Sequence, residues 1–168
     1  MRTNRKRAGS ALIEFTLIGI SGIFITISIA TVALDMWEYY SLAYATEVTS
    51  RYAGLHGSNC ATTPNSCTVT VGFLVSQVFV PSATVLYSGR VNLTFTDGTG
   101  DITCNPASNC SSSSTVFPRA GSNGVGSDIV VKATYPLSRP VLIFWDGSTP
   151  MDMNAFTVAA TSRQRILF

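Results

Sequence analysis

Glu14 is the side chain whose position most clearly suggests a chemical role, because it is the only charged residue in the apolar run 10–34. A carboxylate at the edge of such a run is costly to place in lipid and usually serves a function. The basic segment that precedes the run contains Arg2, Arg5, Lys6 and Arg7. The function of the chain therefore depends on what surrounds the run and on what the carboxylate pairs with.

The four cysteines all follow the apolar run, at Cys60, Cys67, Cys104 and Cys110. If the basic end of the run is cytoplasmic, they lie outside the cytoplasm, where disulfides persist. Of three possible connectivities we favour Cys60 with Cys67 and Cys104 with Cys110, because each closes a short polar loop. Zinc is the alternative, but no histidine stands at ligand spacing and neither pair is C-x-x-C. The only histidine, His56, is expected at the surface near a helix end.

The sequence contains none of the motifs that mark common enzyme active sites. It lacks G-x-S-x-G, a Walker loop, H-E-x-x-H and a G-x-G-x-x-G turn. With one histidine, no nucleophile and base pair is visible. Residues 97–101 (D-G-T-G-D) suggest calcium ligands but lack the terminal Glu of a calcium loop, so we expect an ordinary turn. We therefore expect no enzymatic activity, no cofactor and no metal.

The apolar run has the length of a membrane span. Residues 15–34 are twenty uncharged residues, which match a hydrocarbon core of ~30 Å. A cleaved secretory signal has a shorter apolar stretch and a small-residue cleavage site, which is not found before Asp35. A plain anchor explains every feature except Glu14. Because positive flanks stay cytoplasmic, the N-terminus is predicted inside and the rest of the chain outside.

The residues around Glu14 resemble the leader of a type IV prepilin. Basic residues are followed by Gly9, by S-A-L-I-E-F and by an apolar helix. The pattern is similar to that of TadE-like pseudopilins of the Tad (Flp) tight-adherence pilus system, in which a Tyr- and Ala-rich helix leads to A-R-x-A-A. Here W-E-Y-Y at 37–40 and E-V-T-S-R-Y-A at 47–53 stand in that place. The resemblance covers residues 5–55 and is weaker over 128–166.

This resemblance implies a processing site and an assembly contact. A membrane-bound prepilin peptidase would cut between Gly9 and Ser10, and Glu14, followed by Phe15, would become the fifth residue of the mature chain. In the family this glutamate is thought to pair with the N-terminal amine of a neighbouring subunit, which would set the register of stacked helices. Two alternatives for Glu14 are pairing with the amine of its own chain and extension to the lipid headgroups.

Charge and composition are consistent with a membrane segment and argue against nucleic-acid binding. Hydrophobic residues make up 46% of the 168 residues and charged residues only 12%, as expected when one element lies in lipid. The net charge of +2 conceals an asymmetry, because four positive charges lie within 1–9 and the remainder has seven Lys/Arg against nine Asp/Glu. No basic surface remains for nucleic acid.

One helix is predicted from about residue 10 to residue 52, with Gly54 and Gly57 as plausible stops. Its parts are a basic leader (1–9), a transmembrane helix (10–34) and an amphipathic extension (35–57). A β-rich extracytoplasmic domain (58–168) follows. The stripe expected to face the sheet, at steps of three and four, is Met36, Tyr40, Ala43, Tyr44, Val48, Tyr52 and Leu55.

Period-two alternation predicts strands in the C-terminal domain. The expected strands lie at 68–75, 84–87, 91–95, 128–135 and 156–160, with a loop at 60–67. A Ser/Gly-rich loop is expected at 97–128, and 141–145 is either a buried strand or a loop that touches the membrane or a partner. The fold class is therefore α+β: a long N-terminal helix whose outer half packs on a small, mostly antiparallel sheet.

The expected function is that of a minor pilin or pseudopilin in assembly of a Tad-type pilus, in the bacterial inner membrane. Its expected partners are a prepilin peptidase, other pilin-type subunits through the N-terminal helix, the Tad assembly platform and membrane lipid. The alternative is a single-pass anchored binding domain that is not processed, with its long loop contacting a sugar, a surface or a partner. The mature N-terminus distinguishes the two.

Overall fold

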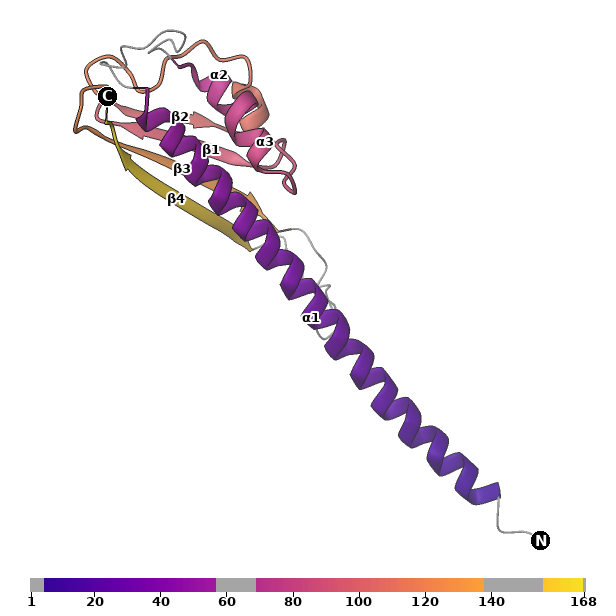
Figure 1. Ribbon diagram of the computed structural model, residues 1–168. Helices are drawn as coiled ribbons and strands as arrows, with labels where there is room; N and C mark the ends of the chain where they lie inside the picture. Colours follow the sequence, from indigo (N-terminus) through magenta and orange to yellow (C-terminus); the bar gives the residue numbers. More distant parts are fainter. Residues whose placement is uncertain (1–4, 57–68, 138–155, 168) are drawn as a thin grey trace.

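The fold is a long helix with a small sheet packed on one end of it. The computed structural model describes residues 5–56, 69–137 and 156–167, with side chains from Ile13 onward. Helix α1 (Arg5–Gly54) forms a stalk, and an antiparallel sheet and a second helical segment gather around its C-terminal half (Figure 1). The predicted α+β architecture is therefore confirmed. The predicted loop at 60–67 and the segment 141–145 lie outside the described residues.

Helix α1 runs without interruption through both predicted segments, the apolar run and its amphipathic extension. It contains 50 residues and no proline, so it extends about 75 Å at 1.5 Å per residue. It ends at Gly54, as predicted, where Leu55 N donates to Arg51 O at 3.2 Å. The backbone of Leu167 donates to Gly54 O at 3.2 Å, so the C-terminal segment is attached to the end of the helix.

The predicted strand at 68–75 is wrong, because this part of the chain is helical. Segments α2 (Val71–Phe73), η1 (Leu74–Phe79) and α3 (Val80–Ser82) follow directly on one another. Thr70 caps the first turn, since its Oγ1 accepts from Phe73 N at 3.2 Å. The buried residues follow steps of three and one, which is a helical period; they are Val71, Leu74, Val75, Val78 and Phe79.

The sheet contains four strands in the order β2-β1-β3-β4, all antiparallel. Strands β1 (Asn92–Asp97), β3 (Asp128–Pro136) and β4 (Thr157–Arg165) confirm three of the predicted strands. The predicted strand at 84–87 is wrong, because a turn forms there, with Leu86 N donating to Ala83 O at 3.0 Å.

The predicted loop at 97–128 is wrong in its first part. Strand β2 (Gly100–Cys104) pairs with β1 through a hairpin that matches Asp97 with Gly100, so an ordinary turn does lie there as expected. The short 3-10 helix η2 (Ala107–Cys110) follows. The rest of the segment is attached to the helical layer, because Val71 N donates to Thr115 O at 2.8 Å and Phe117 N donates to Val69 O at 2.9 Å.

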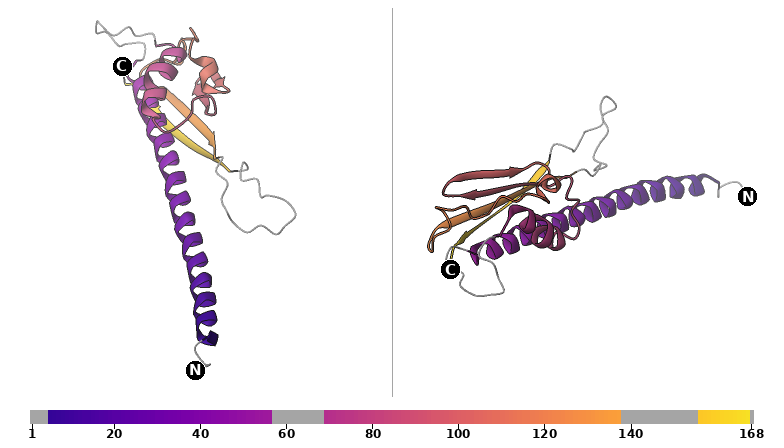
Figure 2. Two further views of the ribbon diagram at one scale, coloured as in Figure 1. Left: turned by 90° about the vertical axis from the view of Figure 1, so that its right-hand side faces the viewer. Right: turned by 90° about the horizontal axis from the view of Figure 1, so that it is seen from above.

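The core lies between the sheet and the helices, which cover one face of the sheet (Figure 2). Alternate side chains of β1 and β3 point into it, as expected for a sheet with one buried face. The largest fully buried side chains in this layer come from the strands, the helical segment and the segment before β3: Leu93, Phe95, Ile129, Val131, Leu74, Phe79 and Phe117.

The face of α1 that packs on the sheet matches the predicted one only in part. Ala43, Val48 and Tyr52 of the predicted stripe are partly buried against the core, but the centre of the packed face is different. The predicted stripe leaves Met36, Tyr40 and Tyr44 exposed to 53%, 62% and 60%. The buried face consists mainly of small residues, and it comprises Leu42, Ala45, Thr46, Thr49, Ser50 and Ala53. Small side chains let the helix approach β3 and β4 closely, where the cross-strand pair Ala133 and Ala160 is itself small.

The prediction that His56 lies at the surface is also wrong. His56 is only 8% exposed, directly after the end of α1. Its ring stacks on the ring of Tyr52, with centroids 4.3 Å apart, and its Nδ1 lies 2.7 Å from Tyr52 O. The histidine therefore closes the last turn of the helix.

Candidate functional site: the exposed half of helix α1

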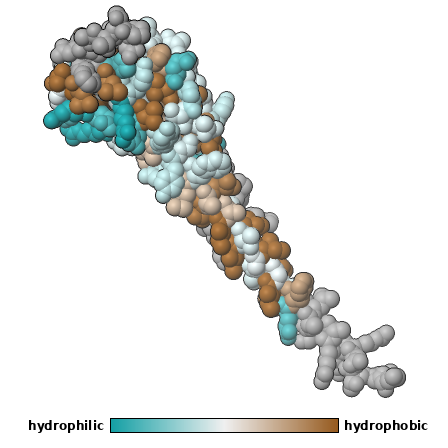
Figure 3. Space-filling model, viewed as in Figure 1, coloured by the Kyte–Doolittle hydropathy of each residue, from teal (hydrophilic) through white to brown (hydrophobic). Residues whose placement is uncertain are grey.

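The N-terminal half of α1 lies outside the packed domain and is covered with large apolar side chains (Figure 3). The helix from Ile13 to Gly54 is long and apolar enough to cross a membrane. A segment of this kind near an N-terminus serves as a membrane anchor or as a signal sequence. The exposed apolar residues before Asp35 include Ile13, Phe15, Leu17, Ile18, Ile20, Ile23, Phe24, Ile25, Ile27, Ile29, Val32 and Leu34.

The hydroxyl groups within this half are hydrogen-bonded to the helix itself. Ser21 Oγ donates to Leu17 O at 2.9 Å, and Thr26 Oγ1 donates to Gly22 O at 2.8 Å. The same kind of bond is made by Thr16, Ser28 and Thr31. Because each of these five hydroxyls is satisfied within the helix, the surface from Ile13 onward is suited to lipid despite its polar residues.

Two glycines leave gaps on this surface. A Cβ placed on Gly19 or Gly22 would meet no atom within 4 Å, so nothing in the described chain requires either glycine. Small residues let a second helix approach closely in lipid. The surface of α1 around Gly22 is therefore open to a neighbouring helix.

The predicted processing and assembly residues all lie at the far end of α1 from the sheet. Gly9 and Ser10 belong to the helix. Glu14 is exposed, and Phe15 beside it is 77% exposed. The carboxylate thus lies where the apolar surface begins, about one turn beyond Ser10. A partner of Glu14 or Phe15 from another molecule can reach these side chains without moving the sheet domain.

The disulfide prediction is confirmed for one of its two pairs. Cys104 and Cys110 are bonded, with their Cα atoms 5.6 Å apart. The bond joins the end of β2 to the end of η2 and fixes the turn between them. Cys60 and Cys67 lie outside the described residues.

Sequence reasoning missed an ion pair between the buried Asp97 and the partly buried Arg119. Arg119 Nη2 donates to Asp97 Oδ1 at 2.8 Å, and its Nε and backbone N donate to Oδ2, both at 3.0 Å. Thr99 donates to Oδ1 through its backbone N at 2.9 Å and its Oγ1 at 2.6 Å. Arg119 also donates to Gly100 O. No signal in the sequence links the two residues, which are 22 positions apart.

This pair perturbs the protonation of Asp97. Burial raises the pKa of the carboxyl, but hydrogen bonds from Arg119 and Thr99 lower it by more, so the pKa lies well below its usual range. The pKa of Arg119 is raised, chiefly by its hydrogen bond to Asp97. The charged pair therefore holds the segment before β3 against the β1–β2 hairpin.

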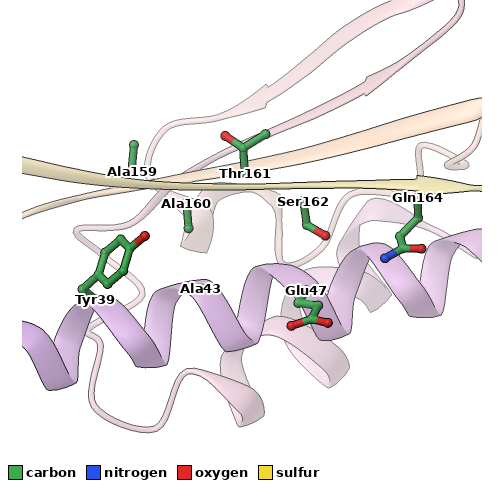
Figure 4. A pocket seen from close by; sticks show the side chains of 8 residues that line it. All are labelled: Tyr39, Ala43, Glu47, Ala159, Ala160, Thr161, Ser162 and Gln164. Carbon is green, nitrogen blue, oxygen red and sulfur yellow. The ribbon is translucent and has the colours of Figure 1, made fainter.

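A shallow groove of about 310 Å³ lies between α1 and the edge strand β4 (Figure 4). Ala160, Ser162 and Gln164 point toward the helix, whereas Ala159 and Thr161 point to the opposite face of the sheet. The helix contributes Tyr39, Ala43 and Glu47 to the lining. The polar groups that line the groove are those of Tyr39, Ser162 and Gln164 and the carboxylate of Glu47, which is paired with Arg51.

Comparison of the chain with models of known protein families, with curated proteins and with solved structures found no match.

Proposed function

We propose that this chain is a TadE-like minor pilin or pseudopilin that takes part in assembly of a Tad-type pilus. The observation that supports this most strongly is the form of α1. One unbroken helix joins an exposed apolar half, which begins at Glu14, to a small sheet domain. Such a helix can lie in a membrane or among other helices while the domain remains outside.

In this proposal the chain is a substrate and not an enzyme. A prepilin peptidase cuts between Gly9 and Ser10, which removes the basic leader with its four positive charges. The new amine of Ser10 lies four residues from Glu14, or about 6 Å along the helix. The carboxylate then pairs with the amine of a neighbouring subunit, because opposite charges attract much more strongly in a low-dielectric site than in water.

The proposed location is the bacterial inner membrane, with the N-terminus in the cytoplasm and the sheet domain outside. Arg2, Arg5, Lys6 and Arg7 before the span support this orientation. The Cys104–Cys110 disulfide suits an oxidising compartment. The proposed partners are the peptidase, other pilin-type subunits that contact α1, the Tad assembly platform and membrane lipid.

The mature N-terminus tests this proposal directly. The protein is extracted from membranes of cells with an active prepilin peptidase and examined by intact mass and N-terminal sequencing. We expect a chain that starts at Ser10. A chain that starts at Met1 would contradict processing, whereas a Gly9→Ala variant should stay uncut if the peptidase needs the glycine.

A second candidate function, an anchored domain that binds an extended peptide, is favoured by the groove beside β4. Leu137 N donates to Phe156 O and Ile166 N donates to Ser127 O, both at 2.9 Å, at the two ends of the β3–β4 ladder. In an antiparallel ladder every second residue pair is joined by backbone hydrogen bonds. Both end pairs use an even-numbered residue on the β4 side, so the even-numbered residues of β4 hydrogen-bond to β3. The backbone groups of Ala159 and Thr161 therefore point toward the edge of β4 that no other described strand pairs with, where a peptide strand can add.

Proline substitutions test this second function. Thr161→Pro removes only a donor at the free edge, whereas Ala160→Pro removes a bond to β3 and should unfold the sheet. If the groove binds a peptide strand, Thr161→Pro leaves the fold intact and abolishes the interaction. Unchanged binding of an extended peptide by Thr161→Pro, with the fold intact, would contradict strand addition at β4.

A further inference from the structure

Helix α1 exposes a group of large side chains on the side that faces away from the sheet, whereas the exposed Tyr39 lies toward the groove beside β4. This aromatic face consists of Met36, Trp37, Tyr40 and Tyr44, which are 53%, 58%, 62% and 60% exposed. At 100° per residue, the four positions fall within an arc of about 100°. That arc is centred about 180° from the buried face around Leu42 and Thr49. The sheet and the aromatic face therefore lie on opposite sides of the helix.

The aromatic face begins directly after the exposed apolar half. Trp37, Tyr40 and Tyr44 lie about 4.5, 9 and 15 Å beyond Leu34 along the helix axis. Long helical side chains lean toward the N-terminus, so their rings reach back toward the apolar half. The face ends where the ion pair of Glu47 and Arg51, at 2.5 Å, begins.

The nearby acidic residues lie on the other side of the helix. Glu38 is buried, and Asp35 is half-buried. At 100° per residue both fall within about 60° of the face that packs on the sheet. No charged residue interrupts the aromatic face between Leu34 and Glu47. The side of α1 that carries the rings is thus the side that a lipid headgroup layer can accept.

We infer that the aromatic face rests in the headgroup layer of the outer leaflet, and that α1 tilts toward this face. Trp and Tyr prefer this layer because one part of each ring is apolar and the other polar. In this tilted orientation the sheet lies on the side of the helix that faces away from the membrane. This inference rests on the membrane anchoring in the proposed function, and not on processing or pilus assembly.

The tilt follows from the length of the aromatic face. Each headgroup layer is about 5–7.5 Å thick, so an upright helix places only Trp37 within it and leaves Tyr44 above it. Transmembrane helices tilt by about 20° on average and by up to about 40°, and interfacial Trp and Tyr residues help to set the direction. Because Tyr44 lies about 15 Å beyond Leu34, the inferred tilt lies in the upper part of this range. Tilting toward the aromatic face lowers Tyr40 and Tyr44 together, whereas tilting toward the sheet would lift them.

Fluorescence quenching by lipid labels tests this placement in the full chain. The protein is inserted in phosphatidylcholine vesicles that carry either a nitroxide on the headgroup or bromines near the chain ends. Trp145→Phe leaves Trp37 as the sole tryptophan. In that background the single tryptophan is the fluorescent reporter. It is moved by replacing Trp37 with Phe and adding one of three substitutions: Tyr44→Trp, Ile25→Trp or Phe73→Trp. Phe73 lies beside Tyr52, at 5.8 Å between ring centroids, and serves as the control outside lipid.

We expect the headgroup label to quench Trp37 and Tyr44→Trp most strongly, the deep label to quench Ile25→Trp, and neither to quench Phe73→Trp. If the headgroup label quenches Trp37 but does not quench Tyr44→Trp, the helix stands upright and the inferred tilt is wrong. If neither label quenches Trp37 or Tyr44→Trp, the face lies in water or against another protein, and the inference falls. If Ile25→Trp is also unquenched, membrane anchoring itself fails.

Discussion

Both halves of helix α1 expose large side chains, but they differ in what they bury. The N-terminal half buries almost nothing within the described chain, and its apolar residues stay on the surface. The C-terminal half buries small residues such as Ala45 and Thr49 against the sheet, and it exposes aromatic ones. Side-chain size thus decides which face of the outer half meets the sheet, and the apolar half is left for lipid or other helices.

If Glu14 pairs with a neighbouring subunit, its loss should have the largest effect on function. Glu14→Gln keeps the shape of the side chain but removes its charge, so we expect normal membrane insertion and loss of pilus output. Glu47→Gln is the control, because Glu47 lies on the same helix and pairs with Arg51 in its own chain. Normal pilus output from Glu14→Gln would contradict the assembly role of the carboxylate.

Two phenylalanines give the largest contrast in stability between the regions. Phe95 is fully buried, with its ring centroid 5.3 Å from that of Phe117, whereas Phe15 is 77% exposed. Phe95→Ala should lower the free energy of unfolding of the domain by about 3–5 kcal/mol, because it removes buried apolar contacts and leaves a cavity. Phe15→Ala should leave it unchanged. Denaturant unfolding in detergent, followed by near-UV circular dichroism, measures both.

The ion pairs of Asp97 and Asp128 allow the same comparison between a buried and a more exposed charge. Asp97→Asn removes the charge that accepts the bonds of Arg119 and Thr99, and it should lower the free energy of unfolding by about 1.5–3 kcal/mol. The matched control is Asp128→Asn, because Asp128 pairs with the exposed Arg163 at 2.6 Å. That variant should show a much smaller loss.

The pH dependence of this pair has a defined sign. Because the folded pKa of Asp97 lies below its unfolded value of about 3.9, the stabilisation is fully present above that value. It is lost as the pH falls below about 4 toward the folded pKa. The difference in unfolding free energy between the wild type and Asp97→Asn should therefore shrink as the pH falls below 4. A difference that stays constant down to pH 2 would rule out the charge as its source.

The sequence predicted the elements whose pattern is strong and local. The long helix and the strands β1, β3 and β4 follow from the apolar run and from clear alternation. The strand expected at 68–75 failed because Val69, Val71, Phe73 and Val75 fit a period of two, while the longer series from Val71 to Phe79 fits a helix. Strand β2 was missed because Ile102 is its only large apolar residue.

The candidate site was predictable only where one segment of the chain carries it. Gly9, Ser10 and Glu14 lie in one continuous pattern, so their place on α1 could be read from the sequence. The packed face of α1 could not, because large apolar residues were expected inside and the close contact selects small ones. The Asp97–Arg119 pair and the groove beside β4 depend on tertiary contacts between segments far apart in the sequence.

The smallest expected effect compares two serines on the same helix. Ser50 is buried, and its Oγ lies 2.9 Å from Glu47 O of its own helix and 2.7 Å from Ser162 Oγ on β4, whereas the hydroxyl of Ser21 bonds only to Leu17 O of its own helix. Ser50→Ala removes a contact between helix and sheet, and it should lower the free energy of unfolding by about 0.5–1.5 kcal/mol. Ser21→Ala should not change it. Combining Ser50→Ala with Ser162→Ala separates the hydrogen bond from the packing, because the second substitution should then add little. Fully additive losses in that double-mutant cycle would show that the two hydroxyls act independently, and that small side chains alone hold α1 against β4.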